Sequence, residues 1–269
     1  GTNITEAVKY LSGIDKDTAS TAAGIASSVA IIVDNGVPSP NAKTYTLTSN
    51  TDNLGGSTGK DVYQGVFDAK GDGTGTTATS GDSMIGGTGV DTFNLSITGD
   101  PTGDSRTISG INADVEKILI SNYETGGEAA ENHTYDAALS DGLTTVGLSS
   151  SNAAGDTIFT NIKGIVNAEM SNGVGDLMVT HTDTAIKGTS DSSTLTVSGQ
   201  TAGLFTDAAS NTAGFGVETI NVVSKGSANT VDITSQRNAL STLNVSGDQD
   251  LTSTITSTAL KTIDASAFT

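Results

Sequence analysis

The nonapeptide GGTGVDTFN, Gly86 to Asn94, decides the fold expected for this chain. It matches the pattern GGxGxDxUx, in which U is an apolar residue, at every fixed position. Glycines allow a tight turn with positive φ whose carbonyl oxygens converge, and Asp91 adds a carboxylate. Six residues thus provide half of an oxygen cage for a hard divalent cation. A second turn must stack on the first to close that cage.

A second copy of this turn lies thirty residues upstream. The segment GSTGKDVYQ, Gly56 to Gln64, keeps Gly56, Gly59, Asp61 and the apolar Tyr63, and departs from the pattern only at Ser57. Two such turns in one chain predict a calcium-binding β-roll rather than a single isolated turn.

Each turn is preceded by another aspartate, nine residues before its own. Asp52 precedes Asp61 and Asp82 precedes Asp91, and nine residues is the period of a β-roll. We therefore expect two parallel pairs, Asp52 with Asp61 and Asp82 with Asp91. The alternative is an ordinary Asp/Gly hairpin turn. The predicted Ca²⁺ ligands are Asp52, Gly56, Gly59, Asp61, Asp82, Gly86, Gly89 and Asp91.

Other acidic residues are weaker candidates. The segment DAKGDG from Asp68 starts like a calcium loop, but Lys70 occupies a ligand position and no glutamate follows at the right distance. Asp68 and Asp72 are either ligands or part of a solvated turn, and the turn is favoured. Glu116 and Glu218 occupy the same position in two copies of the repeat described below, directly after Val115 and Val217. They are either calcium ligands or charged residues at the rim of a coil, and the rim is favoured.

A repeat occupies the rest of the chain. The loose pattern apolar-x-x-apolar-x-apolar-Ser starts at Val115, Leu143, Ile165, Ser192 (a degenerate copy), Val217, Leu240 and Leu260, at spacings of 28, 22, 27, 25, 23 and 20 residues. A unit of this length cannot bury its own inward face, whereas stacked units bury a continuous column. The repeat predicts a parallel β-solenoid. An ordinary β-sandwich that matches by chance is the alternative.

The N-terminal segment has a different texture. Apolar residues recur at helical spacing between residues 3 and 35, and Pro38 and Pro40 follow. We expect a mainly β chain in three parts. These are a helical segment and linker over 1–43, a calcium-binding β-roll region over 44–100, and a repetitive β-solenoid over 101–269.

Composition excludes several classes of partner. Thirty acidic and twelve basic residues give a formal charge of −18, so nucleic-acid phosphate and anionic bilayers would repel the chain. The longest apolar stretch, residues 22–33, is too short for a membrane span of about 20 residues. There is no cysteine, and therefore no disulfide or thiolate metal site.

The sequence carries no catalytic motif that we can identify, and we expect no enzyme. His133 and His181 are far apart, outside any zinc spacing, and are expected to be surface or turn residues. A carbohydrate-active enzyme on a β-helix would need an acid, a base and usually a basic residue in one groove. Arg106 and Arg237 are the only arginines, which makes that alternative weak.

The two nonapeptide turns, followed by ISGINADVEKILI from Ile108 and the later strand repeats, resemble RTX-type bacterial surface-layer proteins. The resemblance covers about residues 44–269, and only the nonapeptide region is specific. It implies a calcium-loaded structural protein, secreted by type I secretion, that self-assembles into a two-dimensional lattice on the cell surface. The implied partners are other copies of itself and lipopolysaccharide or another cell-surface glycan. A module of a secreted RTX adhesin or biofilm-matrix protein is the alternative.

Overall fold

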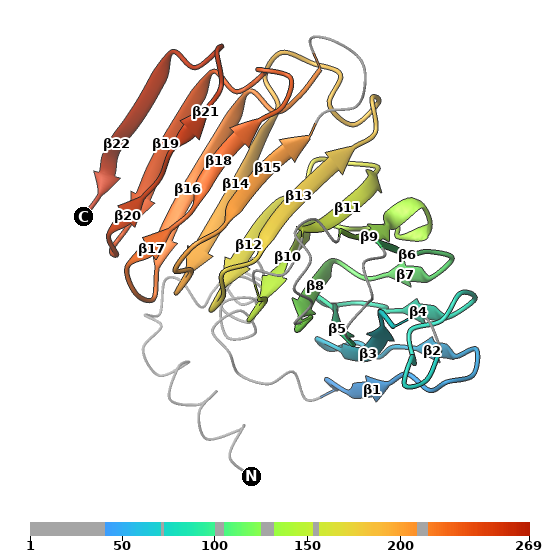
Figure 1. Cartoon of the computed structure of the whole chain (residues 1–269). Coiled ribbons are helices and arrows are strands. Elements are labelled where there is room, and N and C mark those ends of the chain that lie inside the picture. The colour runs from blue at the N-terminus through green and yellow to red at the C-terminus, as the bar shows by residue number, and fades with distance from the viewer. Residues whose placement is uncertain (1–40, 71–72, 100–104, 125–131, 153–155, 209–214) are drawn as a thin grey trace, which may run out of the picture.

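The computed structural model describes residues 41–70, 73–99, 105–124, 132–152, 156–208 and 215–269. This part of the chain is a parallel β-solenoid in which the strands of successive coils stack side by side (Figure 1). Every strand pair in it is parallel, so the β-sandwich alternative is wrong and the solenoid prediction is confirmed. The helical segment expected within residues 1–43 falls almost entirely outside the described residues.

One ten-stranded sheet runs through the whole solenoid. Its strands, in spatial order, are β1 (Thr44–Thr46), β3 (Val62–Asp68), β5 (Thr92–Thr98), β8 (Lys117–Asn122), β10 (Thr145–Ser149), β12 (Asn167–Ser171), β14 (Ser192–Ser198), β16 (Thr219–Lys225), β19 (Thr242–Gly247) and β22 (Thr262–Phe268). The spatial order follows the chain order, and the sheet continues without a break past residue 100.

Three smaller sheets form the remaining faces. The seven-stranded sheet contains β6 (Arg106–Ile108), β9 (His133–Asp136), β11 (Asp156–Ile162), β13 (Asp176–His181), β15 (Leu204–Ala208), β18 (Asp232–Ser235) and β21 (Ile255–Thr256). A three-stranded sheet joins β2 (Asn53–Gly55), β4 (Ser83–Ile85) and β7 (Asn112–Asp114), and a two-stranded sheet joins β17 (Asn229–Thr230) and β20 (Leu251–Thr252). The one helix of the described residues is a 3₁₀ turn, η1 (Ala137–Leu139).

The core is a column of alternating inward residues. In β5, Phe93, Leu95 and Ile97 are buried while the residues between them are partly exposed, as a strand with one inward face requires. Register places Tyr63, Phe93 and Ile118 on top of one another in successive coils. Each coil therefore buries its apolar residues against its neighbours. None of the helices in the described part of the chain is long and apolar enough to cross a bilayer.

The repeat pattern predicts the strand register almost completely. Thr145 pairs with Lys117 and with Asn167, which reproduces the expected spacings of 28 and 22. Later strand pairings reproduce the expected spacings of 27, 23 and 20 residues. The prediction is wrong only at the degenerate copy, where Ser192 pairs with Thr219, two residues beyond Val217. A slip of two residues keeps the same side chains facing inward, so burial does not resist it.

Candidate metal centre

The two glycine-rich turns lie directly against each other. Val62 pairs with Thr92 and Asn53 pairs with Ser83, so the turn 56–61 stacks on the turn 86–91 of the next coil. The Gly56 N–H donates to the carbonyl oxygen of Ile85 at 2.6 Å. The second turn required by the nonapeptide pattern is therefore in place, one coil away.

The aspartates pair differently from the prediction. Asp52 stacks with Asp82, and Asp61 stacks with Asp91, because their coils are thirty residues apart. Aspartates that are nine residues apart precede consecutive strands of one coil, as Asp52 precedes β2 and Asp61 precedes β3. The expected pairs of Asp52 with Asp61 and of Asp82 with Asp91 are thus successive positions along a coil.

Three carboxylates form a ladder beside the turns. Each accepts the backbone N–H at the equivalent position of the coil before it. The Lys43 N–H donates to Asp61 Oδ1 at 2.7 Å, the Asp61 N–H to Asp91 Oδ1 at 2.6 Å, and the Asp91 N–H to Glu116 Oε2 at 2.7 Å. We call Asp61, Asp91 and Glu116 the carboxylate ladder. Its hydrogen bonds tie coil to coil without any metal.

Asp91 differs from the other members of the ladder. Asp61 and Asp91 are both fully buried, but the second oxygen of Asp91, Oδ2, has no hydrogen-bond partner among the described residues. Burial raises the pKa of Asp91. The hydrogen bond from the Asp61 N–H lowers this pKa, whereas the negative charges of Glu116 and Asp61 raise it further. A buried carboxylate oxygen with nothing to bind is costly, and a cation would offset that cost.

Asp61, by contrast, has both oxygens occupied. Ser57 donates to Asp61 through its N–H and its hydroxyl, in addition to the bond from Lys43. Burial opposes ionisation of Asp61, but the Ser57 and Lys43 amides hold its pKa below the usual value. Asp61 therefore closes its own turn, and Ser57, the one departure from the nonapeptide pattern, supplies part of that closure.

The other two predicted aspartates are also bound to the protein. Asp52 accepts the Thr48 N–H at 2.6 Å. Asp82, also buried, accepts the Asp52 N–H at 2.9 Å and the Thr79 N–H at 2.7 Å. Among the four predicted aspartates, Asp91 alone has a buried oxygen without a partner.

The predicted glycines let the two turns approach each other and Asp91 closely. A Cβ on Gly86 would lie 2.2 Å from Asp91 Oδ2, and a Cβ on Gly56 would lie 2.0 Å from the Gly86 carbonyl oxygen. At Gly89, with φ of +132°, it would lie 2.5 Å from the Gly59 carbonyl oxygen. Only glycine allows the two turns to come this close. The unpartnered Asp91 Oδ2 and the backbone carbonyl oxygens of the two turns are the types of donor that Ca²⁺ takes.

Carboxylates alone do not form the cage. No group of three or more His, Cys, Asp or Glu side chains suited to a metal ion occurs in the described ranges. An ion at the turns would take most of its ligands from backbone carbonyls, which Ca²⁺ accepts readily.

The ladder geometry recurs far along the chain. The Asp191 N–H donates to Glu218 Oε2 at 2.7 Å, as the Asp91 N–H does to Glu116 Oε2, and Asp191 Oδ2 is likewise buried with no partner in the described ranges. Glu116 and Glu218 thus occupy matching places, as expected, and both are partly exposed. The segment before Asp191 lacks the glycine pattern, so this second site could not be predicted from the nonapeptide motif.

The prediction for the histidines is wrong. His133 is the first residue of β9 and His181 is the last residue of β13, and both side chains are buried. His133 contacts Glu124, and the Nδ1 atom of His181 lies 3.7 Å from Asp207 Oδ1. The alternation of Leu177, Val179 and His181 along one strand face was the available signal for an inward histidine.

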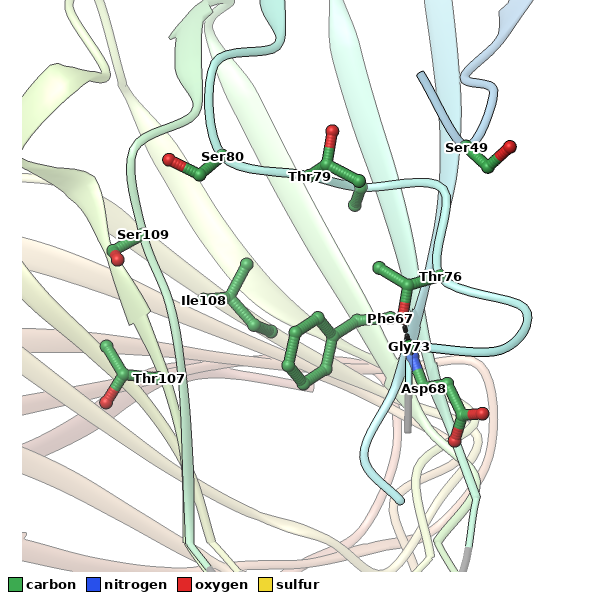
Figure 2. Close-up of a pocket in the computed structure, with 11 residues that line it drawn as sticks. Ser49, Phe67, Asp68, Gly73, Thr76, Thr79, Ser80, Thr107, Ile108 and Ser109 are labelled. Carbon is green, nitrogen blue, oxygen red and sulfur yellow. Dashed lines mark hydrogen bonds between the residues drawn. The ribbon is translucent and has the colours of Figure 1, made fainter. Parts of the chain in front are cut away.

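A groove opens between β3, β6 and the segment that connects β3 to β4. It has a volume of about 440 Å³, and Figure 2 shows the Phe67 ring facing Ile108 across it. Hydroxyl side chains line its walls, and Asp68 lies at one end, where its N–H donates to Thr76 Oγ1. Asp68 thus lines a groove; Asp72, its suggested partner, falls outside the described residues.

Comparisons with protein-family models, curated proteins and solved structures found no significant match to this chain. Function must therefore be argued from the fold and from the stacked turns.

Proposed function

We propose that this protein is a structural component of a bacterial surface layer and that it self-assembles in a calcium-dependent way into a two-dimensional lattice. The observation that carries the proposal is the unpartnered Asp91 Oδ2, buried in one of two stacked glycine-rich turns. The role is architectural rather than catalytic. The protein acts outside the cell, after type I secretion, where calcium is plentiful.

Charge supports a calcium requirement. A chain with a formal charge of −18 repels itself, and each bound Ca²⁺ offsets two negative charges while joining neighbouring coils. Binding to the folded state alone stabilises it by mass action, so folding and assembly should both rise with calcium concentration. The proposed calcium ligands are Asp91 and the carbonyl oxygens of the two turns, while Asp61 and Glu116 position the Asp91 carboxylate and backbone.

The test is a calcium titration of wild-type protein and of Asp91→Asn, followed by circular dichroism and electron microscopy on each sample. We expect ordered two-dimensional arrays of the wild type above a calcium midpoint. In Asp91→Asn, which keeps the side-chain shape but loses the charge, that midpoint should rise about tenfold or more because one charged ligand is lost.

Asp114→Asn is the matched control. It removes one negative charge beside the turn 86–91, whose Gly86 N–H donates to the Asp114 carbonyl oxygen, but the Asp114 side chain is exposed. Its calcium midpoint should stay within about twofold of the wild type. Equal midpoints for wild type and Asp91→Asn, or wild-type arrays that form in a chelator, would contradict the proposal.

A module of a secreted adhesin or biofilm-matrix protein is the second candidate, favoured by the groove around Phe67. Aromatic rings stack on sugar rings, and hydroxyl groups line the groove walls. This module would stay monomeric in calcium and bind lipopolysaccharide or another cell-surface glycan. Glycan binding that is lost in Phe67→Ala, together with the absence of arrays, would favour this candidate over the lattice.

A further inference from the structure

His181 and Asp207 form an isolated polar pair inside the apolar column. His181 ends β13, Asp207 lies in β15 of the next coil, and both side chains are almost fully buried. The side chains around them are those of Val166, Ala168, Val179, Ser193, Phe205, Val217 and Ile220. The space left between these side chains does not admit a water molecule.

The pair is poorly satisfied as an ion pair. His181 Nδ1 lies 3.7 Å from Asp207 Oδ1, beyond hydrogen-bond distance, and neither ring nitrogen of His181 has a hydrogen-bond partner among the described residues. Within the same part of the chain, Asp207 Oδ2 accepts only a long bond, 3.3 Å, from the Val217 N–H. A charged imidazolium here would bury two unsatisfied N–H groups, which costs more than its attraction to the carboxylate repays.

None of the described residues that surround the pair is a lysine or an arginine. Of the elements packed against it, β12, β14 and β16 contribute apolar residues and Ser193, whose hydroxyl donates to the Val166 carbonyl. The nearby charge is that of Glu218, which is negative and acts on Asp207. The surroundings thus favour a protonated carboxyl and a neutral ring.

We propose that His181 and Asp207 are buried as a neutral imidazole and a neutral carboxylic acid, so that folding moves a proton from the imidazolium to the carboxylate. The N–H bond of the ring breaks, an O–H bond forms, and the pair keeps the same number of protons. Asp207 thereby cancels the sensitivity to acid that a lone buried histidine would impose on these coils.

The shifts in pKa give the sign of each contribution. Burial lowers the pKa of His181 to about 4, so its contribution to stability is present above about pH 6.5 and is lost as pH falls. Burial raises the pKa of Asp207 to about 7. The hydrogen bond from the Val217 N–H lowers this pKa, and the negative charge of Glu218 raises it. Its contribution is full at low pH and is lost as pH rises to 7. Between pH 5 and 7 the two opposite trends nearly cancel.

The test measures urea unfolding of wild type, Asp207→Asn and His181→Leu between pH 5 and 7 at fixed calcium. Ratios to the wild type remove the contributions of the other acidic residues. From pH 7 to pH 5, the unfolding constant of Asp207→Asn should rise about 50-fold relative to wild type. That of His181→Leu should fall about 20-fold. Two variants with flat ratios would overturn the proposal.

A direct measurement on the wild type does not depend on either variant folding. The ¹³C and ¹⁵N chemical shifts of the His181 ring, assigned from through-bond correlations, report its charge. We expect a neutral ring at pH 6, although an unperturbed histidine would be mostly charged at that pH. An imidazolium at pH 6 would establish a buried ion pair instead.

Discussion

Buried polar side chains hold the corners of this solenoid by binding backbone groups of neighbouring coils. Asn229 is almost fully buried, and its Oδ1 accepts the Gln200 N–H at 2.9 Å while Nδ2 donates to Ser224 Oγ and to the Ser227 carbonyl. The carboxylate ladder does the same at another corner. Such residues replace, at the turns, the hydrogen bonds that strands provide elsewhere.

Replacing Asn229 with alanine should destabilise the protein by about 2–4 kcal/mol, because the buried Gln200 N–H and Ser224 hydroxyl lose their partner. Chemical denaturation at fixed calcium measures the change. Asn112→Ala is the control, since Asn112 is exposed and its amide makes only a 3.4 Å bond to Ser83. The control should change stability by about 0.5 kcal/mol or less. Equal effects would show that burial at this corner is not what makes Asn229 matter.

The sequence predicts the site only in part at this scale. Residue type and spacing indicate correctly that the two glycine turns stack, since a Cβ on Gly56 or Gly89 would meet a carbonyl oxygen of the other turn. The distinct hydrogen bonding of Asp91 and Asp61 could not be predicted, since it depends on which amide each oxygen meets across the coil boundary.

Strands in this fold are stabilised mainly by the two strands beside them. Leu195 is fully buried in β14, between Ala168 of β12 and Val222 of β16. The alternating pattern of SSTLTVS predicts that Leu195 faces inward, although the copy is degenerate. The exact pairing with β16 was missed because a two-residue shift leaves the inward face apolar in either register.

Leu195→Ala should cost about 2–5 kcal/mol by leaving a cavity in the column. In a solenoid that cost is local, so amide hydrogen exchange should quicken in β12, β14 and β16. Exchange in β3 and β5 should stay near that of the wild type. The neighbouring outward residue provides the control variant, Thr196→Ala, which should change little. Uniform loss of protection along the chain would contradict nearest-neighbour stability.

The described part of the chain is a one-dimensional stack of coils, and the proposed calcium turns lie among its first coils. Residues 44–116 contain both turns, while the distal coils are held by packing and corner hydrogen bonds. The far end carries a strand, β22, whose residues are largely exposed, including Ile263 at 60%. Composition does not predict this difference between the two ends. The difference follows from where the turns fall in the stacking order of the coils.

Chelation of calcium should therefore act unevenly. We expect the chelator to speed amide hydrogen exchange in β1, β3 and β5 first. Amides of β14, β16 and β19 should stay protected until the protein is destabilised much further. Hydrogen exchange with and without a chelator measures this gradient along the sheet. Simultaneous loss of protection in all coils would show that the molecule unfolds as a single unit.

Coils of unequal length share one unbroken sheet. Thr44 pairs with Val62 after 18 residues, whereas Val62 pairs with Thr92 after 30, yet the strands remain in register. Extra residues leave the column at a corner and return to the same position, as the segment between β3 and β4 does. Such corners can accept foreign peptides without disturbing the packed interior, which would make the fold a scaffold for displaying them in rows.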